Sequence, residues 1–373
     1  MHELFWTSAA IVAYVYVGYP ALLALWARLV DRRPRRVPYP PDAWPPISIV
    51  IAARNEAPRL PARVENLIAQ HYPGPSEILV VSDGSTDDPA STLARFGPAV
   101  RLIELPPGGK PAALNAGVAS ASGDIIVFAD ARQRFADGAI AALVENFSDP
   151  RVGGATGELI LDCEERDAGT QVGEGIGLYW TYEKWLRRNE SRVWSTLGAT
   201  GAIYALRRSC WQPLPAQTLL DDVLAPMRAV LNGWRIVFDD RAIAHDRASS
   251  DAAGESRRKT RTLAGNYQIL AQEPRLLLPF VNPVWLQYVS HKVGRLVVPW
   301  ALIGCFAGSL ATAGSGPVYA AALVAQLLFY ALAAAGALQA RERFTRVAFT
   351  FVMMNVAAIA GLAALRRGRE VWR

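Results

Sequence analysis

Short apolar runs alternate with helical patterns through the middle of the chain. Continuous aliphatic and β-branched residues predict buried strands at 47–53, 77–82, 100–105, 124–129, 203–206 and 235–238. Apolar residues at helical spacing follow the first and third strands, at 60–70 and 108–118. Strand–helix alternation with continuously hydrophobic strands indicates an α/β fold, with a parallel sheet covered on both faces.

Longer apolar runs flank this region, and each is about as long as a helix needs to cross a bilayer. They lie at 4–30, 296–313, 318–338 and 347–365. The first has no basic n-region and no A-x-A site, which favours an anchor over a cleaved signal peptide. We therefore expect an N-terminal transmembrane anchor with a basic linker at 1–45. A soluble domain at 46–273 and interfacial helices with a C-terminal transmembrane region at 274–373 follow.

Basic residues border the apolar runs. The segment DRRPRR at 31–36 follows the first run, and the positive-inside rule places it and the soluble domain in the cytoplasm, at the inner membrane. Lys292, Arg295 and the segment 341–346 agree with this orientation, whereas the basic tail at 366–373 does not. Either the last run is re-entrant or interfacial, or the tail is an exception to the positive-inside rule. The sequence is therefore compatible with three or four membrane crossings.

Composition narrows the class of partner. The net charge of +6 is concentrated beside the apolar runs, where anionic lipid explains it without nucleic acid. The three cysteines, Cys163, Cys210 and Cys305, lack metal-type spacing and imply no disulfide framework. The chain gives no indication of its oligomeric state.

Acidic residues at strand ends are the first candidates for chemistry, because ligands bind outside the carboxyl ends of parallel strands. Asp83 and Asp130 follow the second and fourth predicted strands. Asp221 and Asp222 begin a helical pattern that Gly233 ends, so capping is an alternative role for them. The small-residue loop 198–201 allows backbone to approach a ligand. The G-x-G-x-x-G fingerprint and P-loop spacing are absent, which argues against a dehydrogenase or P-loop ATPase.

Six motifs in order give the chain a family resemblance. They are SIVIAARNE, VVSDGSTDD, GKPAALNAGVASASGDIIVFAD, GATGAIYALRR, LLDD and RRKTRTLAGNYQ, spread over 47–268. Together they resemble the family 2 glycosyltransferases, which have the GT-A fold, a Rossmann-like nucleotide-sugar-binding domain. The flanking apolar runs resemble the integral membrane branch of that family.

The resemblance implies a role for each matching residue. Asp83 would contact the nucleoside, with Lys110 and Glu56 also on the donor side. Asp222 would be the general base that deprotonates the acceptor hydroxyl, with Asp221 beside it. Arg261 would contact the leaving diphosphate.

The D-x-D motif departs from the family pattern. Asp130 matches its first aspartate, a ligand of Mg²⁺ or Mn²⁺, but Arg132 stands at the second position. We therefore expect a weakly bound divalent metal on Asp130, or diphosphate charge neutralised by Arg132 itself. His245 is a further candidate ligand, although a lone histidine is more often structural.

The expected function is an inverting, membrane-bound glycosyltransferase that uses a nucleotide-diphosphate sugar, UDP-linked by family default. The acceptor would be lipid-linked or a glycan. A processive polysaccharide synthase is one alternative, although Thr262 replaces the tryptophan that stacks on acceptor sugars in such enzymes. A non-catalytic nucleotide-sugar-binding scaffold is another, suggested by Arg132. The aromatic segment 178–188 serves either core packing or an acceptor surface, and 274–292 would be interfacial.

Overall fold

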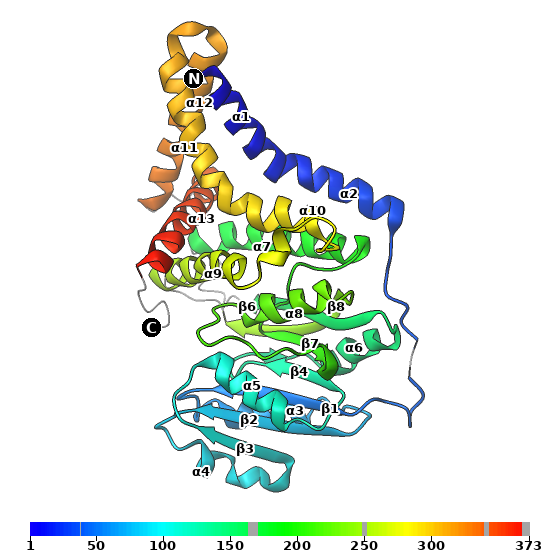
Figure 1. The fold of residues 1–373 in the computed structure, drawn as a ribbon. Coiled ribbons are helices and arrows are strands. Elements are labelled where there is room, and N and C mark those ends of the chain that lie inside the picture. Colours follow the sequence, from blue (N-terminus) through cyan, green and yellow to red (C-terminus); the bar gives the residue numbers. More distant parts are fainter. Residues whose placement is uncertain (38, 163–170, 248–251, 339–342, 368–373) are drawn as a thin grey trace.

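The computed structural model describes residues 1–37, 39–162, 171–247, 252–338 and 343–367. Cys163, positions 341 and 342, and residues 368–373 of the basic tail lie outside the described residues. One sheet forms the centre of the soluble domain (Figure 1), in the order β3-β2-β1-β4-β7-β6-β8-β5. Its strands are β1 (Ile47–Ala53), β2 (Ser76–Asp83), β3 (Val100–Leu105), β4 (Ile125–Ala129), β5 (Arg134–Phe135), β6 (Val152–Asp162), β7 (Ile203–Arg207) and β8 (Arg235–Arg247).

The sheet is mixed, which corrects the expectation of a wholly parallel one. Strands β3, β2, β1 and β4 are parallel neighbours as predicted, but β7 runs antiparallel to both β4 and β6. The register pairs Ile203, the first residue of β7, with Ala129, the last residue of β4. The chain therefore enters β7 at the edge where β4 ends, and this brings the loop 198–201 beside Asp130.

Helices cover both faces of the sheet, as expected for an α/β domain. On one face α3 (Leu60–Ile68) and α6 (Ala139–Glu145) contribute Val64 and Leu143 to a core that also contains Ile49 of β1. On the other face α5 (Lys110–Ser120) and α8 (Asp221–Leu231) contribute Leu114 and Leu224 to a second core. The short helix α4 (Pro89–Leu93) lies near the β3 edge.

Two long helices separate the sheet from the apolar helices (Figure 1): α7 (Gln171–Val193) and α9 (Ala252–Gln272). Leu186 of α7 packs in one cluster with Tyr19 and Leu23 of α2 (Tyr19–Val30). Leu263 of α9 packs with Ala358 of α13 (Arg343–Arg366). The α/β domain is thus joined to the apolar helices by side-chain packing as well as by the polypeptide chain.

Four helices are long and apolar enough to cross a membrane, by length and composition, in the part of the chain that the structure describes. They cover His2–Val30, Trp285–Ser315, Pro317–Ala337 and Phe344–Arg366. The first consists of α1 (His2–Ala13), a π-helical turn η1 (Tyr14–Gly18) and α2; α12 (Pro317–Ala337) is the third. The second consists of α10 (Trp285–Gln287), a π-helical turn η6 (Tyr288–Val293), α11 (Gly294–Thr312) and η7 (Ala313–Ser315).

The second helix begins earlier than the apolar pattern predicts. The predicted start at residue 296 excluded His291, Lys292 and Arg295, because these polar residues interrupt the run. In the structure they continue the helix, and 285–292 therefore forms its first turns. An interfacial position for 274–292 stays a prediction. The charged groups of these three residues face protein rather than lipid, as described below.

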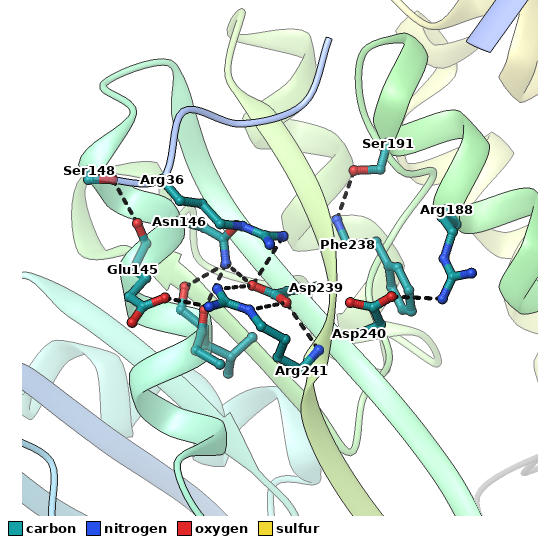
Figure 2. A network of polar contacts seen from close by, with 12 residues as sticks. Arg36, Glu145, Asn146, Ser148, Arg188, Ser191, Phe238, Asp239, Asp240 and Arg241 are labelled. Carbon is teal, nitrogen blue, oxygen red and sulfur yellow. Dashed lines mark hydrogen bonds and ion pairs between the residues drawn. The ribbon is translucent and has the colours of Figure 1, made fainter. Parts of the chain in front are cut away.

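The basic linker after the first helix is docked on the domain (Figure 2). Arg36 Nη2 lies 3.2 Å from Asp239 Oδ2, and the Asp239 side chain is fully buried. Arg241 Nη2 lies 2.9 Å from the same oxygen, and Asn146 Nδ2 donates to it at 2.8 Å. Part of the positive charge in 31–36 therefore neutralises a buried carboxylate of this chain.

Candidate active site

A lysine and two aspartates from three elements meet at the carboxyl end of β4. Lys110 is the first residue of α5, Asp130 directly follows β4, and Asp221 is the first residue of α8. Lys110 Nζ lies 3.2 Å from Asp130 Oδ1 and 3.4 Å from Asp221 Oδ1. Burial opposes the charge on Lys110, but Asp130, Asp221 and Asp222 outweigh it and raise the pKa of the amine. Lys110 therefore stays a cation in this site.

Asp222 is held by the small-residue loop. The Gly201 amide donates to Asp222 Oδ2 at 3.0 Å, and the Ala199 amide donates to the Asp222 carbonyl at 2.7 Å. Burial, and then the neighbouring charge of Asp221, raise the pKa of Asp222 to about 6. The helix is capped by Leu220 without a side-chain hydrogen bond, so the capping role considered for the two aspartates is wrong. The predicted αL residue after the helix is confirmed at Gly233, with φ of 87°.

Asp83 and Glu56 lie away from this cluster. Asp83 is 4% exposed, and its Oδ1 accepts hydrogen bonds from the amides of Gly108 and Gly109 at 2.6 and 2.9 Å. It thereby fixes the turn that precedes Lys110. Glu56 pairs with Arg59 on the domain surface. A nucleoside contact for Asp83 and a donor contact for Glu56 stay predictions.

Arg132 forms its ion pair with Asp246. Its Nη2 lies 3.3 Å from Asp246 Oδ2, and Gln133 Nε2 donates to the same oxygen at 2.9 Å. The sequence analysis did not single out Asp246, which lies 114 positions from Arg132. His245 sits in the β5–β8 ladder opposite Arg134.

The residues at the D-x-D position do not by themselves fit a metal ion. Asp130 offers one carboxylate, and a lysine amine already contacts it. Among the described residues, no three His, Cys, Asp or Glu side chains are grouped so that they could hold a metal. We therefore derive no chemical step through a metal.

A cavity of about 650 Å³ opens beside the cluster. Six of the expected site residues line it, and Asp83 and Glu56 do not. The six are Lys110, Asp130, Arg132, Asp221, Asp222 and Arg261. Arg258 and Lys259 of α9 add further positive charge near Arg261. The cavity is large enough for a sugar nucleotide or for an acceptor headgroup, and its charged lining suits polar groups.

The same cavity extends to the apolar helices, which the sequence analysis did not anticipate. Tyr16 of η1, Lys292 of η6, Arg295 of α11 and Asn355 of α13 line its far wall. Trp180 and Tyr182 of α7 line it too, whereas Leu186 packs on α2. Core packing is thus confirmed for part of the aromatic segment, and its role as an acceptor surface stays a prediction. The sequence contains one signal for this part of the cavity, which is a charged residue next to or within an apolar run. Such residues usually face a protein interior or a polar cavity.

Comparisons with known proteins indicate the family to which this chain is related. Residues 48–212 match the model of Glycosyl transferase family 2. An N-acetylglucosaminyltransferase of Rhizobium leguminosarum bv. trifolii is 32% identical over 123 residues, which are 31% of this chain and 68% of that protein. An N-acetylglucosaminyltransferase of Rhizobium meliloti (strain 1021) is 29% identical over 204 residues, 52% of this chain. The chain spans about half the length of this second relative, 46%.

A solved structure matches nearly the whole chain. It is the mannosyltransferase PcManGT from Pyrobaculum calidifontis in complex with GDP-Man and Mn²⁺, with a TM-score of 0.73 and 24% identity. The match covers 98% of this chain and 100% of that one, apolar helices included. The GT-A fold predicted from the motifs is thereby confirmed. The family model, the curated relatives and the shared fold together show that this chain belongs to glycosyl transferase family 2.

Proposed function

We propose that this protein is an inverting glycosyltransferase that moves a sugar from a nucleotide-diphosphate donor to an acceptor hydroxyl. The observation that carries the proposal is the placement of Asp222. Its carboxylate lines the cavity, is oriented by the Gly201 amide and has a pKa raised to about 6. A carboxylate with that pKa is ionised at neutral pH and accepts a proton more readily than an ordinary aspartate.

The proposed reaction is a single displacement. Asp222 takes the proton of the acceptor hydroxyl as its oxygen bonds to the anomeric carbon, and the bond from that carbon to the diphosphate breaks. The nucleoside diphosphate leaves with the electron pair of the broken bond. Lys110, kept cationic by Asp130 and Asp221, and Arg261 supply positive charge along the cavity wall where the diphosphate would lie.

Donor identity and metal use belong to the same proposal. A uridine nucleotide is the family default, and the fold neighbour from Pyrobaculum calidifontis was solved with GDP-Man and Mn²⁺. A divalent ion would reach the site with the donor diphosphate, and Asp130 would be its protein carboxylate. Such an ion would neutralise phosphate charge.

We also propose a membrane-bound placement with the domain 46–273 on the cytoplasmic side, between the anchor 1–45 and the region 274–373. The four apolar helices and the basic residues at 31–36 support it. The cavity runs from Asp222 to helices of that region, which favours a lipid-linked acceptor over a freely soluble one. Helices on both sides of the cavity would hold such an acceptor close to the base.

The test is donor turnover by purified protein with a membrane lipid extract, across a panel of nucleotide sugars, scored as nucleoside diphosphate release. We expect one donor to be consumed, and Asp222→Asn to lower the rate by about 10²–10⁴-fold with donor affinity nearly unchanged. Asp240→Asn is the matched control, because Asp240 pairs with Arg188 on the surface. Near-normal turnover by Asp222→Asn would refute the assignment of the base. The length of the product distinguishes a single transfer, which adds one sugar, from processive synthesis, which gives a ladder of products.

A further inference from the structure

The membrane side of the cavity carries more positive charge than its own acidic residues neutralise. Glu183 of α7 pairs with Arg295 and also lies 3.5 Å from His291 Nε2. Glu190 occupies the other side of that imidazole, with Oε1 at 2.7 Å from His291 Nδ1. Both carboxylates are therefore already engaged by cations or by an imidazole.

Lys292 lies near both carboxylates, and their charges act on it, but neither is within ion-pair distance. It lines the cavity next to Arg295, and it has no ion-pair partner among the described residues. An ammonium group between a protein domain and apolar helices loses much of its hydration, which costs free energy unless an anion compensates. A lysine that faces a cavity in such a place is suited to bind an anionic group of a ligand.

The position of Lys292 relative to the base defines what that ligand must look like. Both residues line one cavity, and Lys292 comes from η6, which continues into a helix long enough to cross a membrane. The positive charge of Lys292 is near enough to lower the pKa of Asp222 against the effect of burial. A ligand that spans the two residues has a hydroxyl at Asp222 and an anion a short distance away, toward the membrane.

We propose that Lys292 binds the phosphate or diphosphate that links the acceptor to its lipid. This inference rests on the proposed transfer to a lipid-linked acceptor and specifies the chemical class of that acceptor. Arg295 would add a second donor at the same wall while still paired with Glu183. Arg187 hydrogen-bonds the Thr200 hydroxyl of the loop that orients Asp222, which ties this wall to the base.

The diphosphate of the donor is the competing anion for Lys292. Lys110 and Arg261 come from α5 and α9 of the soluble domain, whereas Lys292 comes from the apolar helix on the far wall. An in-line displacement requires the acceptor and the leaving diphosphate on opposite sides of the anomeric carbon. Lys292 and the pair Lys110 and Arg261 come from different elements, so separate cations are available for those two sides.

The test is direct binding, which does not depend on turnover. Calorimetry with detergent-solubilised full-length protein would compare farnesyl diphosphate, inorganic pyrophosphate, farnesol and a nucleoside diphosphate. We expect farnesyl diphosphate to bind most tightly, and Lys292→Gln to weaken it by about tenfold to hundredfold, with partial recovery in Lys292→Arg. Lys184→Gln is the matched control, because Lys184 pairs with Glu158 and is not among the residues that line this cavity.

Three outcomes would overturn the inference. Equal affinity of Lys292→Gln and the unaltered protein for farnesyl diphosphate would remove the assigned contact. Inorganic pyrophosphate binding as tightly as farnesyl diphosphate would indicate a site for a free anion. If Lys292→Gln weakened the binding of a nucleoside diphosphate and left the affinity for farnesyl diphosphate unchanged, Lys292 would be assigned to the donor. Thermal melting of each variant shows whether it is folded. If the protein turned over no donor, the proposed function would be contradicted, but the binding results would still decide the role of Lys292.

Discussion

The Gly201 amide lies 3.0 Å from Asp222 Oδ2, and a Cβ atom added at Gly201 would stand 2.8 Å from that same oxygen. The absence of a side chain at this position therefore lets the backbone reach the carboxylate. The small residues of loop 198–201 predict that its backbone approaches a ligand. In the structure it approaches the proposed base, which it orients.

Gly201→Ala should lower kcat by up to about 100-fold, because the added methyl group must displace the Asp222 carboxylate from its hydrogen bond. The measurement is steady-state turnover of the donor identified in the panel, together with donor affinity, which should change little. Gly314→Ala is the matched control, since a Cβ there meets nothing within 4 Å. An unchanged kcat in Gly201→Ala would mean that the contact does not orient the base.

The rate should fall as the pH decreases through about 6. Burial and the charge of Asp221 raise the pKa of Asp222 to that value, and only the deprotonated carboxylate can accept a proton. Lys110→Gln removes a positive charge that lowers this pKa, so its acidic limb should move to higher pH. The pH profile of kcat/KM, which reports the pKa values of the free enzyme, measures both effects. An acidic limb that stays at the same pH in Lys110→Gln would contradict the electrostatic coupling.

Arg132→Asp should tighten the binding of a divalent metal ion. It places a second carboxylate two positions after Asp130 and removes the cation now paired with Asp246. Electron paramagnetic resonance of Mn²⁺ with donor-free protein should show weak binding to the unaltered chain and clearly tighter binding to the variant. Tight Mn²⁺ binding by the unaltered protein would contradict the reading of its D-x-D position. Unchanged activity in excess chelator would leave charge stabilisation to Lys110 and Arg261.

Asp239→Ala should destabilise the domain by about 3–5 kcal/mol, because it leaves Arg36, Arg241 and Asn146 without their shared acceptor. Burial opposes the charge on Asp239, but Arg241, Asn146 and Arg36 lower its pKa. The contribution of Asp239 to stability should therefore be complete above the ordinary pKa of an aspartate. It should be lost as the pH falls below that value and through the lowered pKa of the folded state.

The measurement for this prediction is thermal unfolding in detergent, and the control is the next residue in the chain. Asp240 forms a surface pair with Arg188, with side-chain exposures of 49% and 46% (Figure 2). Asp240→Ala should cost at most about 1 kcal/mol. Equal losses in the two variants would mean that the Arg36 contact does not hold the linker on the domain.

Local sequence determined the elements and much of their chemistry. Strands β1 and β3 have the predicted bounds, because a continuous apolar run records the burial of that segment whatever lies beside it. The four apolar helices follow for the same reason. Asp130 and Asp222 could be named from the motifs, since each lies within a few residues of a strand end or a helix start.

Tertiary structure alone decided which of these residues meet. Arg132 pairs with Asp246, 114 positions away, and Lys292 shares a cavity with Asp222 although it belongs to an apolar helix. The reversal of β7 and the docking of α7 and α9 on the apolar helices create that cavity. Periodicity describes which face of a segment is buried, but it carries no information about the partner that buries it. That partner is selected by packing and charge over the whole fold, and so the membrane-side wall of this site was visible only in three dimensions.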